Sequence, residues 1–335
     1  SANFNKTTFV SNAAIDGGAI YNVGSTALIS TNFTLNTATN GGAIYNVGST
    51  TLTSTNFTLN TATNGGAIYN VGDILLNKIT IGNSKTKYNV SNNAVYGGAI
   101  YNEGILKSTS SNIYYNTATM FGGAIYNDIV DSSKSLTLTT TNLSYNKTTN
   151  QNGFGGAIYN NVGQINLLGS TFSYNSSSSG GAIYNFGTLV VNNSGKTKSS
   201  FVGNTSSFGG AIYNKGSLNI SNATFTSNTA NEAGGALILS TASTNSNFSA
   251  NITKTTFSKN SSIFGGAIFA LGNSANSVKN YLTISNSSFT SNKSNKDGGA
   301  IYADKNSYIQ IIDTDFKNNI AGRKGGAIFI NGGAE

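Results

Sequence analysis

Short stretches of alternating apolar and polar residues recur along the whole chain, with the period of two that is typical of β-strands. The clearest stretch reads Gly-Gly-Ala-Ile-Tyr-Asn and occurs twelve times with close variants, from Gly17 to the copy that begins at Gly325. Between the copies, an apolar residue stands three positions before an Asn, as in Phe33 and Asn36. No segment keeps an apolar period of 3.6 residues, so the pattern predicts strands and disfavours helices.

The unit of the repeat is defined by residues 17–40 and 41–64, which are almost identical. Each unit of about 24 residues offers three short strands, namely the Gly-Gly-Ala-Ile-Tyr-Asn stretch, a stretch ending in Leu28 or Leu52, and Phe-Thr-Leu-Asn. A fixed unit with insertions indicates a solenoid in which each coil contacts only its neighbours. The sequence therefore predicts an all-β, single-stranded parallel β-helix, right-handed, with about twelve coils of three strands, as one continuous domain over residues 1–335.

Three columns of apolar residues form the predicted core, because equivalent residues of successive coils stack at the strand spacing of about 4.8 Å. The first column is Ile20, Ile44, Ile68, Ile100, Ile125, Ile158, Ile183, Ile212, Leu237, Ile268, Ile301 and Ile328. The second is Leu28, Leu52, Leu138, Leu167, Ile220, Ile252, Ile284 and Ile311. The third is Phe9, Phe33, Phe57, Ile113, Leu143, Phe172, Phe201, Phe225, Phe257, Phe289 and Phe316. Because the second and third columns are five residues apart, a bend must lie between them.

The Asn that ends each Gly-Gly-Ala-Ile-Tyr-Asn stretch shares a strand face with the core Ile. Where it is replaced, the substitutes are apolar (Leu239, Ala270, Ala303 and Ile330), which favours an inward position. We therefore expect a buried amide ladder, with exposed turn residues as the alternative. The ladder would be Asn22, Asn46, Asn70, Asn102, Asn127, Asn160, Asn185 and Asn214.

By the same alternation, the neighbouring aromatic column faces out and forms a stripe of stacked rings on a solvent-facing sheet. This aromatic stripe is Tyr21, Tyr45, Tyr69, Tyr101, Tyr126, Tyr159, Tyr184, Tyr213, Phe269, Tyr302 and Phe329. The paired glycines before it predict a tight corner or a positive φ where a Cβ would clash.

Five insertions lengthen particular coils. Three follow the Ile-Tyr-Asn strand and should emerge from one vertex: residues 128–135, 240–250 and 272–280. Two others are expected before the Phe strand and carry lysine pairs, Lys85 with Lys87 and Lys196 with Lys198. Loops on a rigid scaffold often carry binding, and tolerated insertions without a role are the alternative.

The amino-acid composition limits the kinds of site and partner that this chain can have. The chain has no Cys and no His, so disulfides and thiolate or imidazole metal sites are excluded, and we expect no metal and no cofactor. The formal charge of +8 comes from thinly spread lysines, with Arg323 the single arginine, whereas nucleic-acid binders cluster Arg and Lys beside stacking platforms. No apolar stretch reaches the ~18–20 residues that a membrane helix needs. We therefore expect neither nucleic-acid partners nor a membrane span.

The alternation of Gly-Gly-Ala-Ile with Phe-x-x-Asn resembles the polymorphic outer membrane protein repeat, which adhesin-like surface proteins of archaea also carry. The resemblance covers essentially the whole chain and implies a surface adhesin or secreted passenger domain, exposed outside the cell and engaged in attachment. Two departures are that Ile113 and Leu143 replace Phe, and that Tyr88 to Ser91 lacks the expected Asn.

A carbohydrate-active enzyme is the remote alternative, since some β-helices cleave polysaccharides with clustered carboxylates. The nearest acidic pairs are Asp313 with Asp315, expected on one face of a strand, and Asp128 with Asp131 in a loop. Neither pair supplies a convincing catalytic or calcium site. We therefore predict no catalytic residues.

The leading hypothesis is an extracellular adhesin that binds a glycan or a host or cell-surface protein through its vertex loops and aromatic stripe. The candidate binding residues are the central members of the stripe: Tyr101, Tyr126, Tyr159, Tyr184 and Tyr213. The alternative is a structural subunit of an extracellular fibre or sheath that self-associates end to end through uncapped coils.

Overall fold

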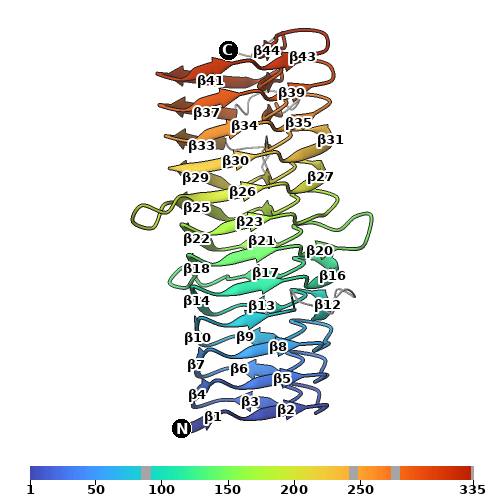
Figure 1. The fold of residues 1–335 in the computed structure, drawn as a ribbon, viewed down its shortest axis with the longest axis vertical. Coiled ribbons are helices and arrows are strands. Elements are labelled where there is room, and N and C mark those ends of the chain that lie inside the picture. The colour runs from blue at the N-terminus through green and yellow to red at the C-terminus, as the bar shows by residue number, and fades with distance from the viewer. Residues whose placement is uncertain (84–91, 241–247, 273–279, 333–335) are drawn as a thin grey trace.

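The computed structural model describes residues 1–83, 92–240, 248–272 and 280–332. Their strands stack in register along one long axis, with the N-terminus at one end and the C-terminal strands at the other (Figure 1). Three parallel sheets of twelve strands each run the length of the molecule. Twelve strands per sheet enclose eleven complete turns of about 28 residues, because insertions lengthen the 24-residue unit. The parallel β-solenoid predicted from the sequence is confirmed.

The first sheet, called sheet A, contains the core residues of the predicted second column. Its strands are β1 (Ala2–Asn5), β4 (Ser25–Ile29), β7 (Ser49–Thr53), β10 (Asp73–Asn77), β14 (Ile105–Thr109), β18 (Ser135–Thr139), β22 (Gln164–Leu168), β25 (Thr188–Asn192), β29 (Ser217–Ser221), β33 (Phe248–Thr253), β37 (Asn280–Ser285) and β41 (Ser307–Ile312).

Sheet B contains the third column. Its strands are β2 (Thr8–Val10), β5 (Asn32–Thr34), β8 (Asn56–Thr58), β11 (Thr80–Ile81), β15 (Asn112–Tyr114), β19 (Asn142–Ser144), β23 (Thr171–Ser173), β26 (Ser199–Val202), β30 (Ala223–Thr226), β34 (Thr256–Ser258), β38 (Ser288–Thr290) and β42 (Asp315–Lys317).

Sheet D contains the Ile-Tyr-Asn strands. They are β3 (Ile20–Asn22), β6 (Ile44–Asn46), β9 (Ile68–Asn70), β13 (Ile100–Asn102), β17 (Ile125–Asp128), β21 (Ile158–Val162), β24 (Ile183–Asn185), β28 (Ile212–Asn214), β32 (Leu237–Leu239), β36 (Ile268–Ala270), β40 (Ile301–Ala303) and β44 (Ile328–Ile330).

A fourth strand, which the sequence pattern did not predict, completes some coils between sheets B and D. These short strands form two further sheets. One contains β12 (Asn93–Tyr96), β16 (Thr117–Phe121) and β20 (Lys147–Thr148), and the other contains β27 (Thr205–Phe208), β31 (Thr229–Ala233), β35 (Ser261–Ser262), β39 (Lys293–Ser294) and β43 (Ile320–Ala321). In the remaining coils this side is held by isolated bridges such as Thr37 to Thr61.

The three predicted columns line the interior. Ile44, Leu52 and Phe57 are all fully buried, and the Phe rings stack with near-parallel planes, as Phe33 and Phe57 do with centroids 4.8 Å apart. The columns are more complete than the pattern indicated. Strand pairing adds Phe4, Leu76, Ser108 and Val191 to the second column and Ile81 to the third.

The bend expected between the second and third columns is a residue in the left-handed backbone region. Ser30 has a φ of 51° and Ser54 a φ of 50°, and this single residue lets Leu28 and Phe33 both face inward despite their odd spacing. The first glycine of each pair also has a positive φ, 61° at Gly17. At the second glycine the backbone of the next coil leaves no space, since a Cβ on Gly42 would lie 2.1 Å from the carbonyl oxygen of Gly66.

The predicted amide ladder is present and buried. Nδ2 of Asn46 donates to Oδ1 of Asn70 at 2.8 Å, and the same bond links consecutive members from Asn22 to Asn214. A second ladder, which we did not predict, follows the Phe-x-x-Asn residues. It contains Asn12, Asn36, Asn60, Asn92, Asn116, Asn146, Asn175, Asn204, Asn228, Asn260, Asn292 and Asn319.

Candidate binding surface

The aromatic stripe stacks along the outside of sheet D as the alternation predicted. Its rings follow one another with centroids 4.7 to 5.6 Å apart from Tyr21 to Tyr213, and the register of the strands places each Tyr directly opposite the next. Ile238 interrupts the aromatic column on β32, and rings resume at Phe269. The stripe is therefore a continuous aromatic surface over eight coils.

The expectation that this whole stripe faces solvent is wrong for its centre. Tyr21 is 55% exposed, but Tyr159 and Tyr184 are only 7% and 4% exposed. Phe121 stacks on Tyr159 at 4.7 Å and Phe154 stacks on Tyr184 at 4.7 Å. Both phenylalanines stand directly before a glycine pair, a position that Asp16, Asn40 and Asn64 occupy in the first coils. An outer aromatic layer thus covers the stripe where those positions are aromatic.

Of the five candidate tyrosines, Tyr101, Tyr126 and Tyr213 remain partly exposed, whereas Tyr159 and Tyr184 do not. Burial raises the pKa of all five phenols, to about 12 for Tyr159. The hydroxyl of Tyr101 donates to Asp128 at 3.2 Å, and the nearby carboxylate raises the Tyr101 pKa further. These tyrosines therefore stay neutral hydrogen-bond donors across the physiological pH range.

Lys215 lies over the last two rings of the continuous stripe, Tyr184 and Tyr213. Its Nζ lies 5.9 Å from the Tyr184 ring, 5.1 Å from Phe186 and 5.7 Å from Tyr213, so three rings surround one ammonium. Desolvation lowers the pKa of Lys215 from its ordinary value. The cation holds Phe186 against the stripe and adds to the cover over Tyr184.

Stacking also limits what the stripe can bind. A sugar packs its apolar face onto an aromatic face, but each ring within the stripe already has neighbours above and below it. What remains accessible is the outer edge of each ring and its hydroxyl group. The surface around Tyr101 and Tyr126 thus offers phenol hydroxyl groups on an apolar base, with the Tyr101 hydroxyl donating to Asp128.

The predicted vertex between sheets D and A carries an exposed loop. Residues 129–134 join β17 to β18. Ile129 is buried in the core, whereas Val130 is 83% exposed, and Oδ1 of Asp131 accepts from the backbone and hydroxyl of Ser133. Residues 241–247 and 273–279, which contain most of the other two vertex insertions, lie outside the described residues. The strands on either side of them belong to the same two sheets, which agrees with a shared vertex.

The two lysine-bearing insertions differ from each other. Lys196 and Lys198 lie where we expected, before the sheet B strand β26, in a loop that projects beside β25 (Figure 1). Lys85 and Lys87 lie outside the described residues, but their predicted place was wrong. Ile81 occupies the Phe position of that coil and Asn92 its ladder position, so this insertion follows the sheet B strand instead of preceding it.

The acidic residues of the described ranges lie in separate places. No group of three or more Asp or Glu residues there could hold a metal ion. Asp313 and Asp315 do not share a strand face, contrary to expectation, because Asp313 is a left-handed corner residue with a φ of 46° and β42 begins at Asp315. Asp128 instead serves as an acceptor for Tyr101 and Asn161.

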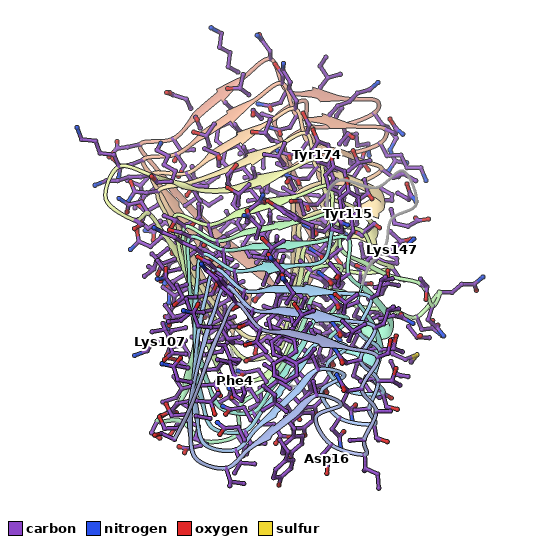
Figure 2. The ribbon with its side chains drawn as sticks, turned by 60° about the horizontal axis from the view of Figure 1, so that its bottom comes forward. Phe4, Asp16, Lys107, Tyr115, Lys147 and Tyr174 are labelled. Atoms are coloured by element: carbon purple, nitrogen blue, oxygen red, sulfur yellow. The ribbon has the colours of Figure 1, made fainter. Side chains whose placement is uncertain are left out.

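Sequence reasoning missed a second aromatic row. Tyr115, Tyr145 and Tyr174, here called the corner tyrosines, follow sheet B strands directly and stack with centroids 4.8 and 5.1 Å apart. Figure 2 places Tyr115 and Tyr174 beside Lys147, on the side of the view away from Lys107. The signal in the sequence was a Tyr directly before the ladder Asn in three consecutive coils.

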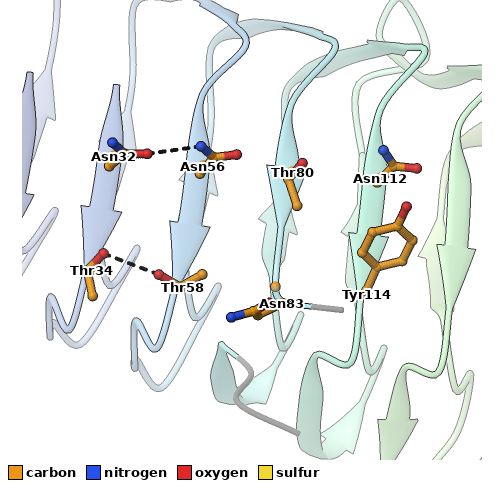
Figure 3. A pocket seen from close by; sticks show the side chains of 9 residues that line it. Asn32, Thr34, Asn56, Thr58, Thr80, Asn83, Asn112 and Tyr114 are labelled. Carbon is orange, nitrogen blue, oxygen red and sulfur yellow. Dashed lines mark hydrogen bonds between the residues drawn. The ribbon is translucent and has the colours of Figure 1, made fainter. Parts of the chain in front are cut away.

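The outer face of sheet B is a polar surface with a hollow of about 470 Å³ (Figure 3). Its lining is neutral, with side-chain amides and hydroxyls from Asn32, Asn56, Thr58 and Asn112, and Tyr114 stands at one end. Asn56 donates to Asn32 at 2.9 Å, and the hydroxyls of Thr34 and Thr58 lie 3.2 Å apart. Rows of equal polar groups are thus repeated from coil to coil on this face.

The Chlamydia polymorphic membrane protein repeat matches this chain in seven places: residues 30–47, 54–71, 169–185, 198–215, 254–271, 286–304 and 313–331. Each match spans a sheet B strand, the following ladder Asn and the next Ile-Tyr-Asn strand or its variant. The chain contains polymorphic membrane protein repeats. The repeat thus coincides with the part of the coil that contains the Phe column, both glycines and the two ladder positions.

Proteins with polymorphic membrane protein repeats are associated with the outer membrane or the cell surface, which fits a surface protein. Comparisons with curated proteins and with solved structures returned no match. Among the described residues, no helix is long and apolar enough to cross a membrane.

Proposed function

We propose that this chain is an extracellular adhesin module that attaches to a glycan or a protein on another surface and performs no catalysis. The observation that carries the proposal is a rigid solenoid of surface-protein repeats whose outward positions form long rows of like groups. A repeated row suits multivalent attachment, because several weak contacts act together at high effective concentration.

Attachment is proposed to involve the accessible edges of Tyr101, Tyr126 and Tyr213 together with the vertex loop at residues 129–134. The five candidate tyrosines have different parts in this proposal. Tyr159 and Tyr184 would act as the packed support of the stripe, since their own rings are covered. An exposed apolar tip such as Val130 is of the kind that contributes to protein contacts.

The test is binding of the fluorescently labelled chain to cultured epithelial cells and to a glycan array. One variant replaces Tyr101, Tyr126 and Tyr213 by Ile, the residue that the chain itself places in this column at Ile238. A second keeps the buried Ile129 and replaces residues 130–134 by one Gly, so that Ile-Gly takes the place that Val47 and Gly48 have in another coil. Loss of cell binding in either variant, with unchanged circular dichroism, supports the proposal.

The matched control replaces Tyr308 by Ile, which changes an exposed ring on sheet A outside the stripe and should leave binding intact. Absence of binding by the parent chain to every cell and glycan tested would refute the adhesin function. End-to-end self-association stays a prediction, and negative-stain electron microscopy across a concentration series tests it by the presence or absence of filaments.

A further inference from the structure

The corner tyrosines occupy a backbone conformation that is unfavourable for bulky side chains. Tyr115, Tyr145 and Tyr174 have φ values of 54°, 56° and 55°, in the left-handed region that Gly and Asn adopt at the lowest energetic cost. Other coils place smaller or more flexible residues at this corner, such as Ser11, Gly203 and Ser227. Three consecutive aromatic residues at such a position are more than the corner itself requires, and backbone strain of this kind often accompanies function.

Tyr115 is partly exposed and the other two rings are exposed, unlike the centre of the aromatic stripe. Tyr145 is 44% exposed and Tyr174 is 52% exposed. The last ring leans over a glycine, since a Cβ on Gly203 would lie 2.6 Å from Cε1 of Tyr174. The planes of neighbouring rings lie 4° and 15° from parallel, with centroids 4.8 and 5.1 Å apart, so their faces cover one another as in the aromatic stripe and the outer edges and hydroxyl groups stay accessible.

A furrow of about 210 Å³ runs beside the corner tyrosines along the solenoid axis. The three rings form one wall, and Thr117, Lys147 and Ser176, one from each of the same coils, form the other. Lys147 is exposed, and no ion pair among the described residues joins it to an acid. The furrow thus combines a row of stacked rings, repeated at the coil spacing, with two hydroxyl groups and one cation on the other wall.

We propose that this furrow binds a linear acidic oligosaccharide that lies along the solenoid axis with one sugar per coil. The coil spacing of about 4.8 Å is close to the length of one pyranose residue, so successive sugars would meet successive rings in register. The outer edges of the rings contact the C–H groups of the sugars, while the tyrosine hydroxyls and Ser176 supply hydrogen bonds. Lys147 pairs with a carboxylate. The proposal rests on the attachment function above and names the ligand class for a different surface.

The probe is a tetramer of galacturonic acid, with the neutral galactose tetramer of the same linkage as its matched partner. Titration calorimetry at low salt should detect the acidic tetramer and give weaker binding of the neutral one. Added salt should weaken only the acidic interaction, because it screens an exposed charge pair.

The variants use residues that the chain already places at the same positions. Replacing Tyr115, Tyr145 and Tyr174 together by Leu copies Leu35 and Leu59, which have φ values of 60° at this corner, so the fold is expected to persist. This change should weaken binding about tenfold or more, because three ring contacts are lost. Lys147→Thr copies Thr117 on the neighbouring strand and should weaken acidic binding about two- to fivefold, as expected for an exposed ion pair.

Lys293→Thr is the control, since Lys293 occupies the corresponding position on β39 but has Lys259, Ser291 and Asn318 at the neighbouring corners in place of tyrosines. It should leave binding unchanged. Equal affinity for the neutral tetramer, or equal losses in the Lys147 and Lys293 variants, would overturn the proposal. Unchanged binding of the acidic tetramer by the triple Leu variant would overturn this inference alone and leave the adhesin function standing, since that function is tested by the stripe and vertex-loop variants.

Discussion

Removal of one amide from the second Asn ladder should destabilise the solenoid far more than its size indicates. Asn175 is fully buried at the middle of the molecule. Its Oδ1 accepts from the backbone amide of Asn146 at 2.9 Å and from Nδ2 of Asn146 at 3.1 Å. Its Nδ2 donates to the carbonyl of Leu143 at 2.9 Å and to Oδ1 of Asn204 at 3.0 Å. Asn175→Ala therefore deletes four hydrogen bonds at one corner.

The magnitude follows from which groups lose a partner. The backbone amide of Asn146 loses its side-chain acceptor in a buried place, which costs about 1–3 kcal/mol. The Leu143 carbonyl and the Nδ2 group of Asn146 each lose one bond, at about 1 kcal/mol apiece. We expect the free energy of unfolding to fall by roughly 3–5 kcal/mol, at the upper end of single substitutions.

Asn214→Leu is the matched comparison, because the chain makes a similar change one coil later at Leu239. Asn185, its neighbour in the ladder, keeps the Gly187 carbonyl at 3.0 Å as a partner for Nδ2. This variant should lose less than about 2 kcal/mol.

Urea unfolding measures both variants, and amide hydrogen exchange locates the effect. Since each coil contacts only its neighbours, protection should fall at Asn146 and nearby amides while Ile44 keeps its protection. A loss below about 1 kcal/mol for Asn175→Ala, or a loss no larger than that of Asn214→Leu, would refute the idea that this ladder stabilises the corner.

Four further outcomes follow from the geometry. Gly181→Ala should abolish folding, because the added Cβ would lie 2.2 Å from the Gly210 carbonyl oxygen. Gly24→Ala should be tolerated, because no atom lies within 4 Å of the added Cβ. Circular dichroism of the purified variants distinguishes the two outcomes. Stability should decline as pH rises from about 10 toward 12, because the buried tyrosines hold their protons more tightly in the folded state, and normal stability at pH 12 would contradict this. Tyrosinate absorbance in an alkaline titration should appear at higher pH in the folded chain than in urea. Lys215→Ala should expose Tyr184, with faster nitration of tyrosine in the variant as the measurement and unchanged nitration as the contrary result.

Much of the interior could be predicted from the sequence, because strand alternation and exact stacking determine it together. Once Ile44 and Asn46 are placed inward, every equivalent residue of the other coils follows. The second ladder was missed for a reason in physical chemistry. An Asn three positions after a Phe reads as an ordinary turn residue, and only the left-handed residue before it, such as Leu35, turns its amide into the interior.

The exposure of the aromatic stripe could not be predicted from alternation, which assigns a side chain to a face but does not say what covers that face. The cover over Tyr159 comes from Phe121, a residue that belongs to a different strand in the preceding coil. The misplaced insertion has a similar origin. The isoleucine at Ile81 fills the Phe position without resembling it, so the motif alone pointed to the wrong residue.

The corner column explains how one rigid repeat can present different chemistry from coil to coil. Leu35, Tyr145, Gly203 and Lys259 share one backbone conformation, with φ values from 55° to 62°, although their side chains have little in common. The ladder Asn that follows each of them makes the same inward hydrogen bonds, so the fold does not depend on which side chain the corner residue carries. Selection for a ligand can therefore change this column freely at a local cost in backbone strain, and a row of three tyrosines beside a lysine is the kind of variation that such a scaffold permits.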